Sequence, residues 1–544
     1  MMEHLPIGWV ECQLHDVFQP RRVRVSPQEF SDMPFIGMDH VESATMRVVG
    51  RGLAGEMKSA CFRFYQSDVI YGRLRPYLNK VAVPGFDGLA SGEFIVFPPS
   101  EAVIPYYLAY RLSASDFVAF ASRLDEGDRP RVSFQQIGSF PLTIPPLAEQ
   151  RAVVAKIDAL FSELDKGIEQ LHTIKQQLKQ YRQAVLKAAF EGRLTAAWRA
   201  EQQAEGTLPS ADELLERIEK EREARYQQRL DEWKQAVDEW QADGGRESGR
   251  RRPSKPSVPK ALSDLTEAEL GSLYVLPGEW RWVRLGQLCE SVRNGISDKP
   301  SDSPPGFPIL RISAVRPMYV DLSEARYHDR PRGEVETFLI RNGDLLFTRY
   351  NGSLHLVGVC GMVRGCNASI LHPDKLIRVA LAAPSIVSAF VELAANSGVS
   401  RDFVVSRART TAGQTGISGE DVRNIPLPLP SLPELERIVD ELSFRLSMLD
   451  ELEKAVDYAT NRAEALRRSI LRKAFEGRLL SEAESTDVRN DPEYEPADKL
   501  LERIRAAGGT GKQPSRPDRA RKRAHPMRPS CPRGNAAETG SEEE

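Results

Sequence analysis

AFEGRL stands at residues 189–194, and the same six letters return at residues 474–479. An identical phrase 285 positions apart indicates an internal repeat, and a repeat has to be traced before any fold is assigned. At the same offset, IPPLAE (144–149) matches LPSLPE (429–434), and Ser133 matches Ser418. The chain therefore contains a tandem duplication.

The beginnings of the two halves match at a shorter offset. LPIGW at 5–9 corresponds to LPGEW at 276–280, which is an offset of 271. Between these anchors, SDVIYGRL (67–74) resembles GDLLFTRY (343–350), so that Asp68 aligns with Asp344 and Arg73 with Arg349. Each half is therefore expected to hold a globular part followed by one long helix, with 14 additional residues in the second globular part.

The residues after each proline-rich segment predict a long helix with an apolar stripe at 3–4 spacing, which is typical of a helix that packs on a partner helix. Gly192 and Gly477 stand where a helix C-terminus favours a residue with positive φ. A helix of about 42 residues would be roughly 60 Å long. The residues expected at the interface of an antiparallel coiled coil are Ile157, Leu160, Leu164, Leu171, Ile174, Leu178 and Val185 in the first helix and Leu442, Leu449, Leu452, Val456, Leu466 and Ile470 in the second.

The rest of the chain divides by composition. The stretches before the helices are rich in short β-like runs interrupted by helical segments, so the fold class is α+β, with two repeated mixed α/β domains separated by the two long helices. The expected segments are domain 1 (1–146), the first helix (147–195), a charged helical insertion with a flexible basic linker (196–275), domain 2 (276–431), the second helix (432–480) and a largely disordered extension (481–544).

Composition excludes several classes of protein. There is no stretch of about 18 apolar residues, so no membrane span is expected, and the first residues lack the design of a signal peptide. Six scattered cysteines without a CxxC pair give neither a disulfide framework nor a short-spaced metal site. A net charge of −3 argues against a uniformly basic surface. We therefore expect a cytoplasmic protein.

Catalytic motifs are missing from the sequence. The phosphate-binding pattern GxxxxGK[ST] is absent, as are a glycine-rich loop after a strand and the short proline-rich motif of amino-methyltransferases. Cys360, Cys366 and His372 lack a fourth ligand for a metal. The chain is therefore expected to have no catalytic or metal-binding residues and not to be an enzyme by itself, and a fused methyltransferase is disfavoured.

The repeated motifs resemble a known family. IPPLAEQRAVVAKIDALF (144–161), followed by a long helix and AFEGRL in both copies, resembles the specificity (S) subunit of type I restriction–modification systems. The second copy departs from the pattern, with Leu435 where Gln150 stands in the first. The resemblance implies a non-catalytic subunit with two target recognition domains, each reading one half of a bipartite site in double-stranded DNA. It also implies docking of two methyltransferase (modification) subunits and of restriction/translocase subunits, which would bind the S-adenosylmethionine, ATP and Mg that this chain does not bind.

Polar residues after matching strands are the candidates for DNA contact. Arginine suits the acceptor edge of guanine, and asparagine or glutamine suits adenine. Arg73 and Arg349 occupy matching positions in the two copies, so they are expected to contact DNA phosphate or to hold the framework of the domain, and not to read the sequence. The candidates are Arg73, Arg75, Tyr77, Lys80, Arg129 and Arg131 in the first domain and Arg349, Tyr350, Asn351, Arg407, Arg409, Thr411 and Gln414 in the second. The alternative is a coiled-coil scaffold without sequence-specific DNA binding, which these variable polar segments disfavour.

Overall fold

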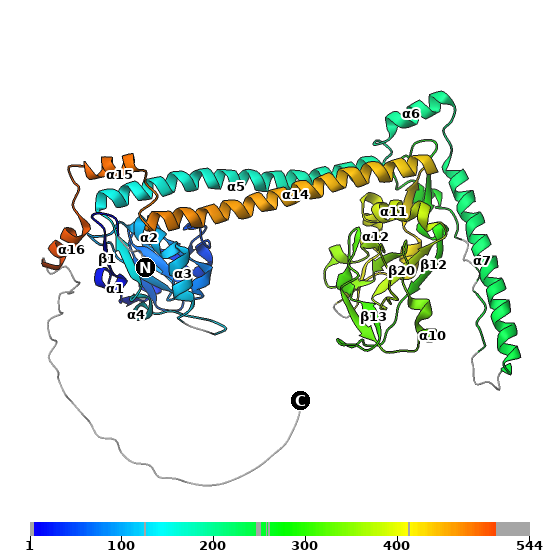
Figure 1. The fold of residues 1–544 in the computed structure, drawn as a ribbon, viewed down its shortest axis with the longest axis horizontal. Helices are drawn as coiled ribbons and strands as arrows, with labels where there is room; N and C mark the ends of the chain where they lie inside the picture. The colour runs from blue at the N-terminus through cyan, green and yellow to red at the C-terminus, as the bar shows by residue number, and fades with distance from the viewer. Residues whose placement is uncertain are drawn as a thin grey trace, which may run out of the picture. The chain divides into compact units, whose positions relative to one another are not determined.

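The structure is a computed structural model that describes residues 5–124, 127–245, 252–256, 258, 262–411 and 414–506. The chain divides into two compact units, one formed by Met1–Gly167 with Arg462–Glu544 and the other by Ile168–Asn461. Each unit therefore holds one globular domain and segments of both long helices, α5 (Leu147–Phe190) and α14 (Leu432–Phe475), which Figure 1 shows in cyan and orange.

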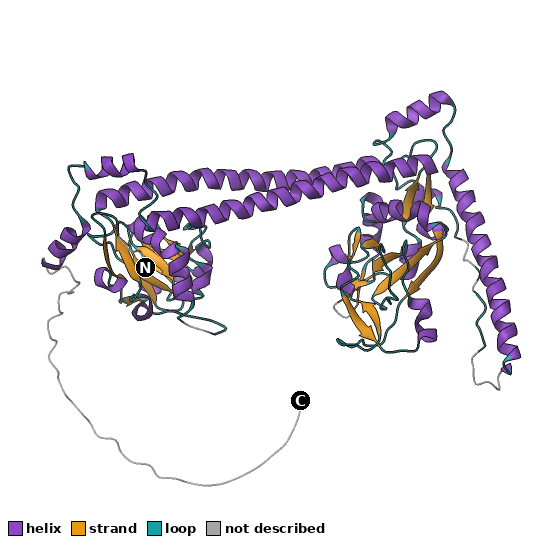
Figure 2. Ribbon diagram, viewed as in Figure 1, coloured by secondary structure: helices purple, strands orange, loops and turns teal. Residues whose placement is uncertain are grey.

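The globular part of unit 1 contains short strands, the helices α2 (Pro105–Ser113) and α3 (Ser115–Ser122), and the four-residue helices α1 (Leu14–Val17) and α4 (Phe134–Ile137) (Figure 2). Its sheets have the orders β2-β5-β8-β3-β4, β7-β6-β9 and β1-β10. Strands β6 and β9 are buried along their whole length because both are continuous apolar runs. The strands are β1 (Val10–Gln13), β2 (Arg24–Val25), β3 (Pro34–Ile36), β4 (Gly52–Leu53), β5 (Cys61–Phe64), β6 (Val69–Gly72), β7 (Val81–Ala82), β8 (Gly88–Ala90), β9 (Phe94–Phe97) and β10 (Pro141–Ile144).

Unit 2 has the corresponding helices α11 (Pro384–Ala395) and α12 (Gly398–Arg407). Its larger sheets have the orders β12-β20-β17-β19 and β18-β22-β21, and β11-β23, β13-β16 and β14-β15 form pairs. The strands are β11 (Arg281–Arg284), β12 (Cys289–Asn294), β13 (Phe307–Leu310), β14 (Val315–Arg316), β15 (Tyr319–Val320), β16 (Ala325–His328), β17 (Leu345–Thr348), β18 (Tyr350–Asn351), β19 (Cys360–Met362), β20 (Leu376–Leu381), β21 (Arg409–Thr411), β22 (Gln414–Gly416) and β23 (Pro426–Leu429).

The first and last strands of each domain pair in the same register. Val10 of β1 lies opposite Ile144 of β10, and Arg281 of β11 lies opposite Leu429 of β23. Both pairs are antiparallel, and they are related by the two sequence offsets, 271 for the first strand and 285 for the last. The predicted duplication is therefore also a duplication of structure.

The repeated phrase AFEGRL ends each long helix with the same backbone motif. Arg193 N–H donates to Ala188 O at 2.8 Å, and Gly192, with φ of 71°, caps the helix. Arg478 N–H donates to Lys473 O at 2.8 Å, and Gly477 has φ of 67°. These six-to-one hydrogen bonds form a Schellman motif, and the positive φ predicted for Gly192 and Gly477 is confirmed.

The phenylalanine of each AFEGRL enters the domain of the other repeat. Phe475, at the end of α14, lies in the core of unit 1 and contacts Tyr107 of α2. Phe190, at the end of α5, lies in the core of unit 2 and contacts Phe390 of α11. Each domain core is therefore completed by the end of the helix that follows the other domain.

Helices α5 and α14 pair antiparallel within each unit. In unit 1, Arg467 contacts Asp165 at 2.8 Å, and in unit 2, Lys175 contacts Asp457 at 2.7 Å. Residue numbers thus rise on one helix while they fall on the other, which is the predicted antiparallel coiled coil. Exposed ion pairs contribute little stability, so the apolar seam carries most of the pairing free energy.

Burial divides the residues predicted for this seam. Buried or half-buried positions are Ile157, Leu160, Leu164, Leu171, Leu178, Val185, Leu442, Leu449, Val456 and Ile470. Ile174, Leu452 and Leu466 are 41%, 49% and 50% exposed, so the interface prediction is wrong for these three. Leu452 lies about 40–60° around the helix axis from the buried line through Leu449 and Val456, on the side of the exposed Phe444 and Met448.

The substitution of Gln150 by Leu435 exchanges a polar anchor for an apolar one. The Gln150 side chain accepts from Ile104 N–H at 2.8 Å and donates to Ala102 O and Pro145 O at 2.8 and 2.9 Å. Leu435, at the equivalent place, is 1% exposed within the core of unit 2. Both helices start at equivalent leucines, so the departure changes the anchoring of the helix and leaves its start in place.

A second repeated phrase, ADELLERI (211–218) and ADKLLERI (497–504), also docks in the same way in both units. Ala211 N–H donates to Glu279 O at 3.0 Å, and Ala497 N–H donates to Gly8 O at 3.0 Å. The phrases begin helices α7 (Ala211–Ala242) and α16 (Ala497–Ala506), whose leucines are buried against the domain cores. The extension that was predicted to be largely disordered, 481–544, contains α15 (Glu482–Arg489) and α16, and residues 507–544 lie outside the described residues.

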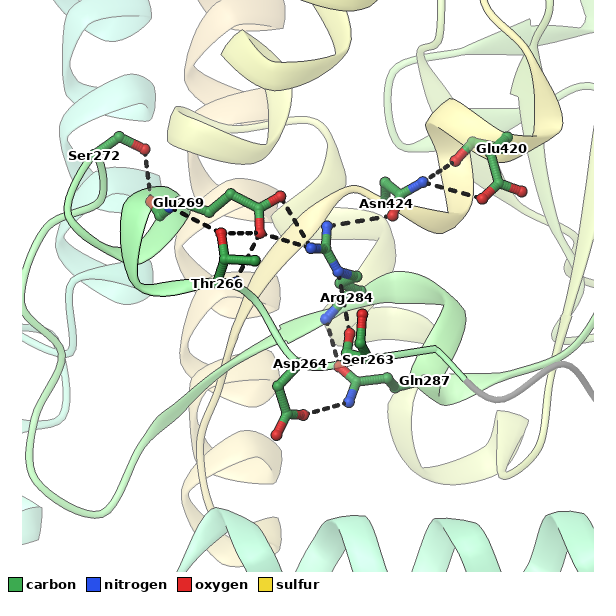
Figure 3. A network of polar contacts seen from close by, with 9 residues as sticks. All are labelled: Ser263, Asp264, Thr266, Glu269, Ser272, Arg284, Gln287, Glu420 and Asn424. Atoms are coloured by element: carbon green, nitrogen blue, oxygen red, sulfur yellow. Dashed lines mark hydrogen bonds and ion pairs between the residues drawn. The ribbon is translucent and has the colours of Figure 1, made fainter.

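The insertion between the first helix and the second domain contains α6 (Ala196–Glu205), α7 and α8 (Glu267–Leu270). Residues 246–251, 257 and 259–261 of the predicted basic linker lie outside the described residues. Arg284 ties α8 to domain 2, because its guanidinium donates to both Glu269 oxygens at 2.7 and 2.9 Å and to Asn424 Oδ1 at 3.2 Å (Figure 3). Hydrogen bonds from Thr266 N–H and from Arg284 lower the pKa of Glu269 to about 2. In the part of the chain that the structure describes, no helix is long and apolar enough to cross a membrane.

Candidate nucleic-acid interface

The two candidate segments of domain 1 lie against each other. Strand β6 ends at Gly72, and the chain after it runs beside residues 130–132. Arg75 N–H donates to Pro130 O at 2.7 Å, Val132 N–H donates to Arg73 O at 3.0 Å, and Leu74 forms an isolated bridge with Arg131. Residues 73–80 and 129–131, which are far apart in the sequence, therefore form one surface.

Side-chain contacts separate these candidates into tied and exposed groups. Lys80 Nζ donates to Met38 O at 2.6 Å, and Arg131 makes a two-pronged contact with Glu93 at 2.8 and 3.1 Å. The hydrogen bonds from Arg131 to Glu93 raise the pKa of the guanidinium, which keeps its charge. Tyr77, by contrast, is 55% exposed at the tip of the turn, and Arg129 is exposed. Arg131 is exposed as well despite its ion pair, so Tyr77, Arg129 and Arg131 are the side chains that this surface presents to solvent.

The turn that carries Tyr77 is held in an uncommon backbone conformation. Arg75 and Asn79, on either side of Pro76–Leu78, have φ of 52° and 49°, a region that residues other than glycine rarely adopt. The Asn79 amide donates to Ser113 O at 3.0 Å and so fixes the turn on the end of α2. Arg75 therefore contributes to this surface through its backbone conformation, which shapes the turn.

The candidates of domain 2 also meet on one surface. Strand β18, with Tyr350 and Asn351, pairs with β22, and β22 pairs with β21. Ile417 N–H donates to Arg349 O at 3.0 Å, and this bond joins residues equivalent to Val132 and Arg73 in domain 1. The same backbone bond therefore holds the two candidate segments together in both domains.

The side chains of domain 2 divide in the same manner. The Arg349 guanidinium lies over the Tyr350 ring at 4.7 Å and donates to Asp374 O at 3.3 Å. Asn351 Oδ1 accepts from Ser353 N–H at 3.0 Å. The exposed side chains are Arg407, whose guanidinium lies 5.0 Å from the Phe403 ring, together with Arg409 and Gln414; the side chain of Thr411 lies outside what the structure describes.

Sequence reasoning missed a group of basic residues before the second strand of domain 1. The run RRVR at 21–24 was the available signal, and Arg22 and Arg24 are exposed. Arg21 makes a two-pronged contact with Asp68, a residue that is fully buried directly before β6. Asp68 was matched with Asp344 from the sequence, but Arg21 could not be assigned to it because the two residues are 47 positions apart.

No cluster of three or more histidine, cysteine or acidic residues suited to a metal ion occurs within the described residues. Cys360 and His372 are buried among apolar residues, and burial raises the pKa of the Cys360 thiol. What the two surfaces offer instead is exposed donors and an aromatic ring, which are groups that contact base edges and phosphates.

Comparison with known proteins agrees with this chemistry. The family described as "Type I restriction modification DNA specificity domain" matches residues 6–180. The type I restriction enzyme EcoKI specificity subunit of Escherichia coli (strain K12) is 31% identical over 429 residues, which cover 77% of this chain and 76% of that protein. The chain belongs to the specificity subunits of type I restriction–modification systems.

Further relatives extend over both repeats. The StySPI specificity subunit of Salmonella potsdam is 26% identical over 425 residues, covering 77% of this chain and 75% of that protein. A chain from a structure titled for complex assembly and conformational transition of the type I R-M system matches with a TM-score of 0.55 at 18% identity, covering 88% of this chain and all of that one. This specificity subunit therefore has the fold of that solved chain, and its recognition domains serve DNA sequence recognition.

Proposed function

We propose that this specificity subunit reads a bipartite DNA target without performing catalysis, with one recognition domain for each half-site. The observation that carries the proposal is the pair of equivalent bonds, Val132 to Arg73 and Ile417 to Arg349. Equivalent bonds hold equivalent surfaces, yet the exposed side chains on them differ. They are Tyr77, Arg129 and Arg131 in one domain and Arg407, Arg409 and Gln414 in the other. A common frame with different polar side chains is what two half-sites of different sequence require.

The long helices would serve the assembly of the complex. We assign to α5 and α14 the docking of two methyltransferase subunits, with restriction/translocase subunits joining that assembly. S-adenosylmethionine, ATP and Mg would be bound by those partners, in the cytoplasm. The exposed apolar side chains Phe444, Met448 and Leu452 on one face of α14 support a role of this helix in contacts beyond its pairing with α5.

Exchange of one domain tests the modular reading. Residues 276–431 are replaced by the equivalent domain of another specificity subunit, while α5 and α14 are kept because their ends complete the domain cores. We expect methylation at a target in which only one half has changed. The reciprocal exchange of residues 1–146 is the control and should change the other half. A change in both halves would refute the modular reading, and intact methylation of the original target would favour the scaffold.

A further inference from the structure

Each recognition domain contains a buried aspartate at the start of its repeated central strand. Asp68 precedes β6 and is fully buried, and Asp344 precedes β17 and is 7% exposed. Asp68 Oδ2 accepts from Tyr65 N–H at 2.9 Å, and Asp344 Oδ2 accepts from Arg341 N–H at 2.8 Å. The same turn is therefore closed by the same carboxylate in both domains.

A nearby arginine neutralises each of these aspartates, although the two arginines come from different places in their domains. Arg21, before β2, donates to both oxygens of Asp68 at 2.6 and 2.9 Å. In domain 2 the partner is Arg378 of β20, whose Nε lies 3.8 Å from Asp344 Oδ2. Because one guanidinium already balances each carboxylate, every further arginine at these places adds uncompensated positive charge.

Domain 1 adds three further arginines around this pair. Arg22 and Arg24 are exposed and Arg63 is half-buried. The guanidinium of Arg24 lies 5.1 Å from the Phe62 ring, and that of Arg63 lies 5.1 Å from the Tyr65 ring. Among the described residues none of the three forms an ion pair, so the cluster keeps an excess of positive charge with planar groups held on aromatic rings.

Domain 2 adds Arg293 and Arg341, which are exposed. Arg293 lies opposite Arg378 in the β12–β20 register, and it corresponds to Arg22 at the offset of 271. Burial lowers the pKa of Arg378; the carboxylate of Asp344 opposes this shift, and the positive charges of Arg293 and Arg341 add to it. The neighbouring Glu290 forms ion pairs with Arg225 and Arg229 of α7 at 3.3 and 3.0 Å, so its negative charge is already balanced.

We propose that Arg22 and Arg24 in domain 1, and Arg293 and Arg341 in domain 2, bind DNA phosphates on either half-site and position the duplex without reading its sequence. Two half-sites with different bases share only the sugar-phosphate backbone, so a feature that recurs in both domains suits that common ligand. In domain 1, the buried Asp68 of the arginine cluster lies directly before β6, and the candidate DNA-contact segment 73–80 follows the end of the same strand. Residues 68 and 73 are separated by about 16 Å along an extended chain, which is of the same order as the major-groove width of about 12 Å.

This inference rests on the proposed function of the domains as readers of DNA, and salt dependence tests it separately. The complete complex with its methyltransferase subunits is titrated with a duplex carrying its target and with a random duplex of equal length, between about 50 and 200 mM salt. Each phosphate contact contributes about 0.9 to the slope of log affinity against log salt. The double variant R22A/R24A should therefore lower the slope by about 1.8 on both duplexes, and so should R293A/R341A.

Matched variants complete the experiment. Arg217→Ala removes a charge from the exposed face of α7 and should leave the slope unchanged. R22K/R24K should keep most of the slope, because lysine retains the charge that phosphate requires, and it also serves if the alanine variant does not fold. An unchanged slope, or a loss confined to the target duplex, would overturn the inference. If the unaltered complex showed no preference for its target, the proposed function would fail instead, whatever the slopes.

Discussion

The ring of Phe475 stands edge-on to the ring of Tyr107, with 5.4 Å between their centroids. Phe475 belongs to the second repeat and Tyr107 to the first domain, so the end of one repeat fills the core of the other. Phe190 and Phe390 form the reciprocal contact at 5.5 Å. AFEGRL occurs twice because the cores of the two domains contain equivalent sites in which its phenylalanine packs.

Removal of either phenylalanine should loosen the domain in which it packs, which is the domain that precedes the other long helix. Truncation of a buried phenylalanine to alanine costs about 3–5 kcal/mol. In F475A we expect faster amide hydrogen exchange in α2 of unit 1, and in F190A faster exchange in α11 of unit 2, measured by mass spectrometry. Faster exchange in α11 for F475A would contradict the exchanged arrangement of helix ends.

Glycine at the end of α14 should resist substitution. A Cβ at Gly477 would lie 2.3 Å from Pro6 Cγ, and its φ of 67° costs other residues about 1–2 kcal/mol. G477A should therefore lower the free energy of unfolding in urea by at least that amount. The control is G167A within α5, where a Cβ meets nothing within 4 Å and alanine should stabilise the helix by about 0.5–1 kcal/mol. Equal effects of the two substitutions would refute this reading.

Stability should depend on pH through His372. Burial lowers its pKa from 6.5 to about 4, and its Nδ1 contacts Phe338 O at 2.7 Å. Between these values the unfolded chain binds a proton that the folded domain rejects, so stability is complete above pH 6.5 and falls as the pH drops towards 4. The loss from this group is about 3 kcal/mol at most.

The variant H372N isolates this contribution, because the asparagine amide can still donate to Phe338 O while it does not titrate. The urea midpoints of the unaltered protein and of H372N should converge as the pH falls from about 7 to about 4. This interval covers the ordinary pKa of histidine and the lowered pKa of His372. Parallel curves across that interval would mean that His372 does not lose stability by protonation.

Substitution of exposed residues of the candidate surfaces should change which DNA sequence is recognised, whereas substitution of residues hydrogen-bonded within their own domain should not. Arg409 is exposed on β21, so R409A should relax one position of the second half-site, by about 1–3 kcal/mol of discrimination. Lys80 is held by Met38 O, so K80A should weaken domain 1 and leave the recognised sequence unchanged. Competition binding with duplexes that differ at single base pairs measures both. A relaxed first half-site in R409A would be incompatible with one domain per half-site.

The duplication, the two long helices and their glycine caps could be predicted because they depend on local patterns at fixed spacing. The seam was predicted less well: Leu452 and Leu466 satisfy the heptad spacing, yet each is about half exposed, since spacing alone does not fix which of two apolar faces meets the partner. The pairing of Asp68 with Arg21 depends on contacts between strands far apart in the sequence. The exchange of helix ends could not be read from the sequence for the same reason.

The most direct measurement is a map of methylated adenines in host DNA with and without this chain, in the presence of its methyltransferase partners. We expect one split motif, two short half-sites with a fixed gap, which disappears when the chain is removed and returns when it is restored. A map that is the same in both cases would contradict a role in sequence recognition.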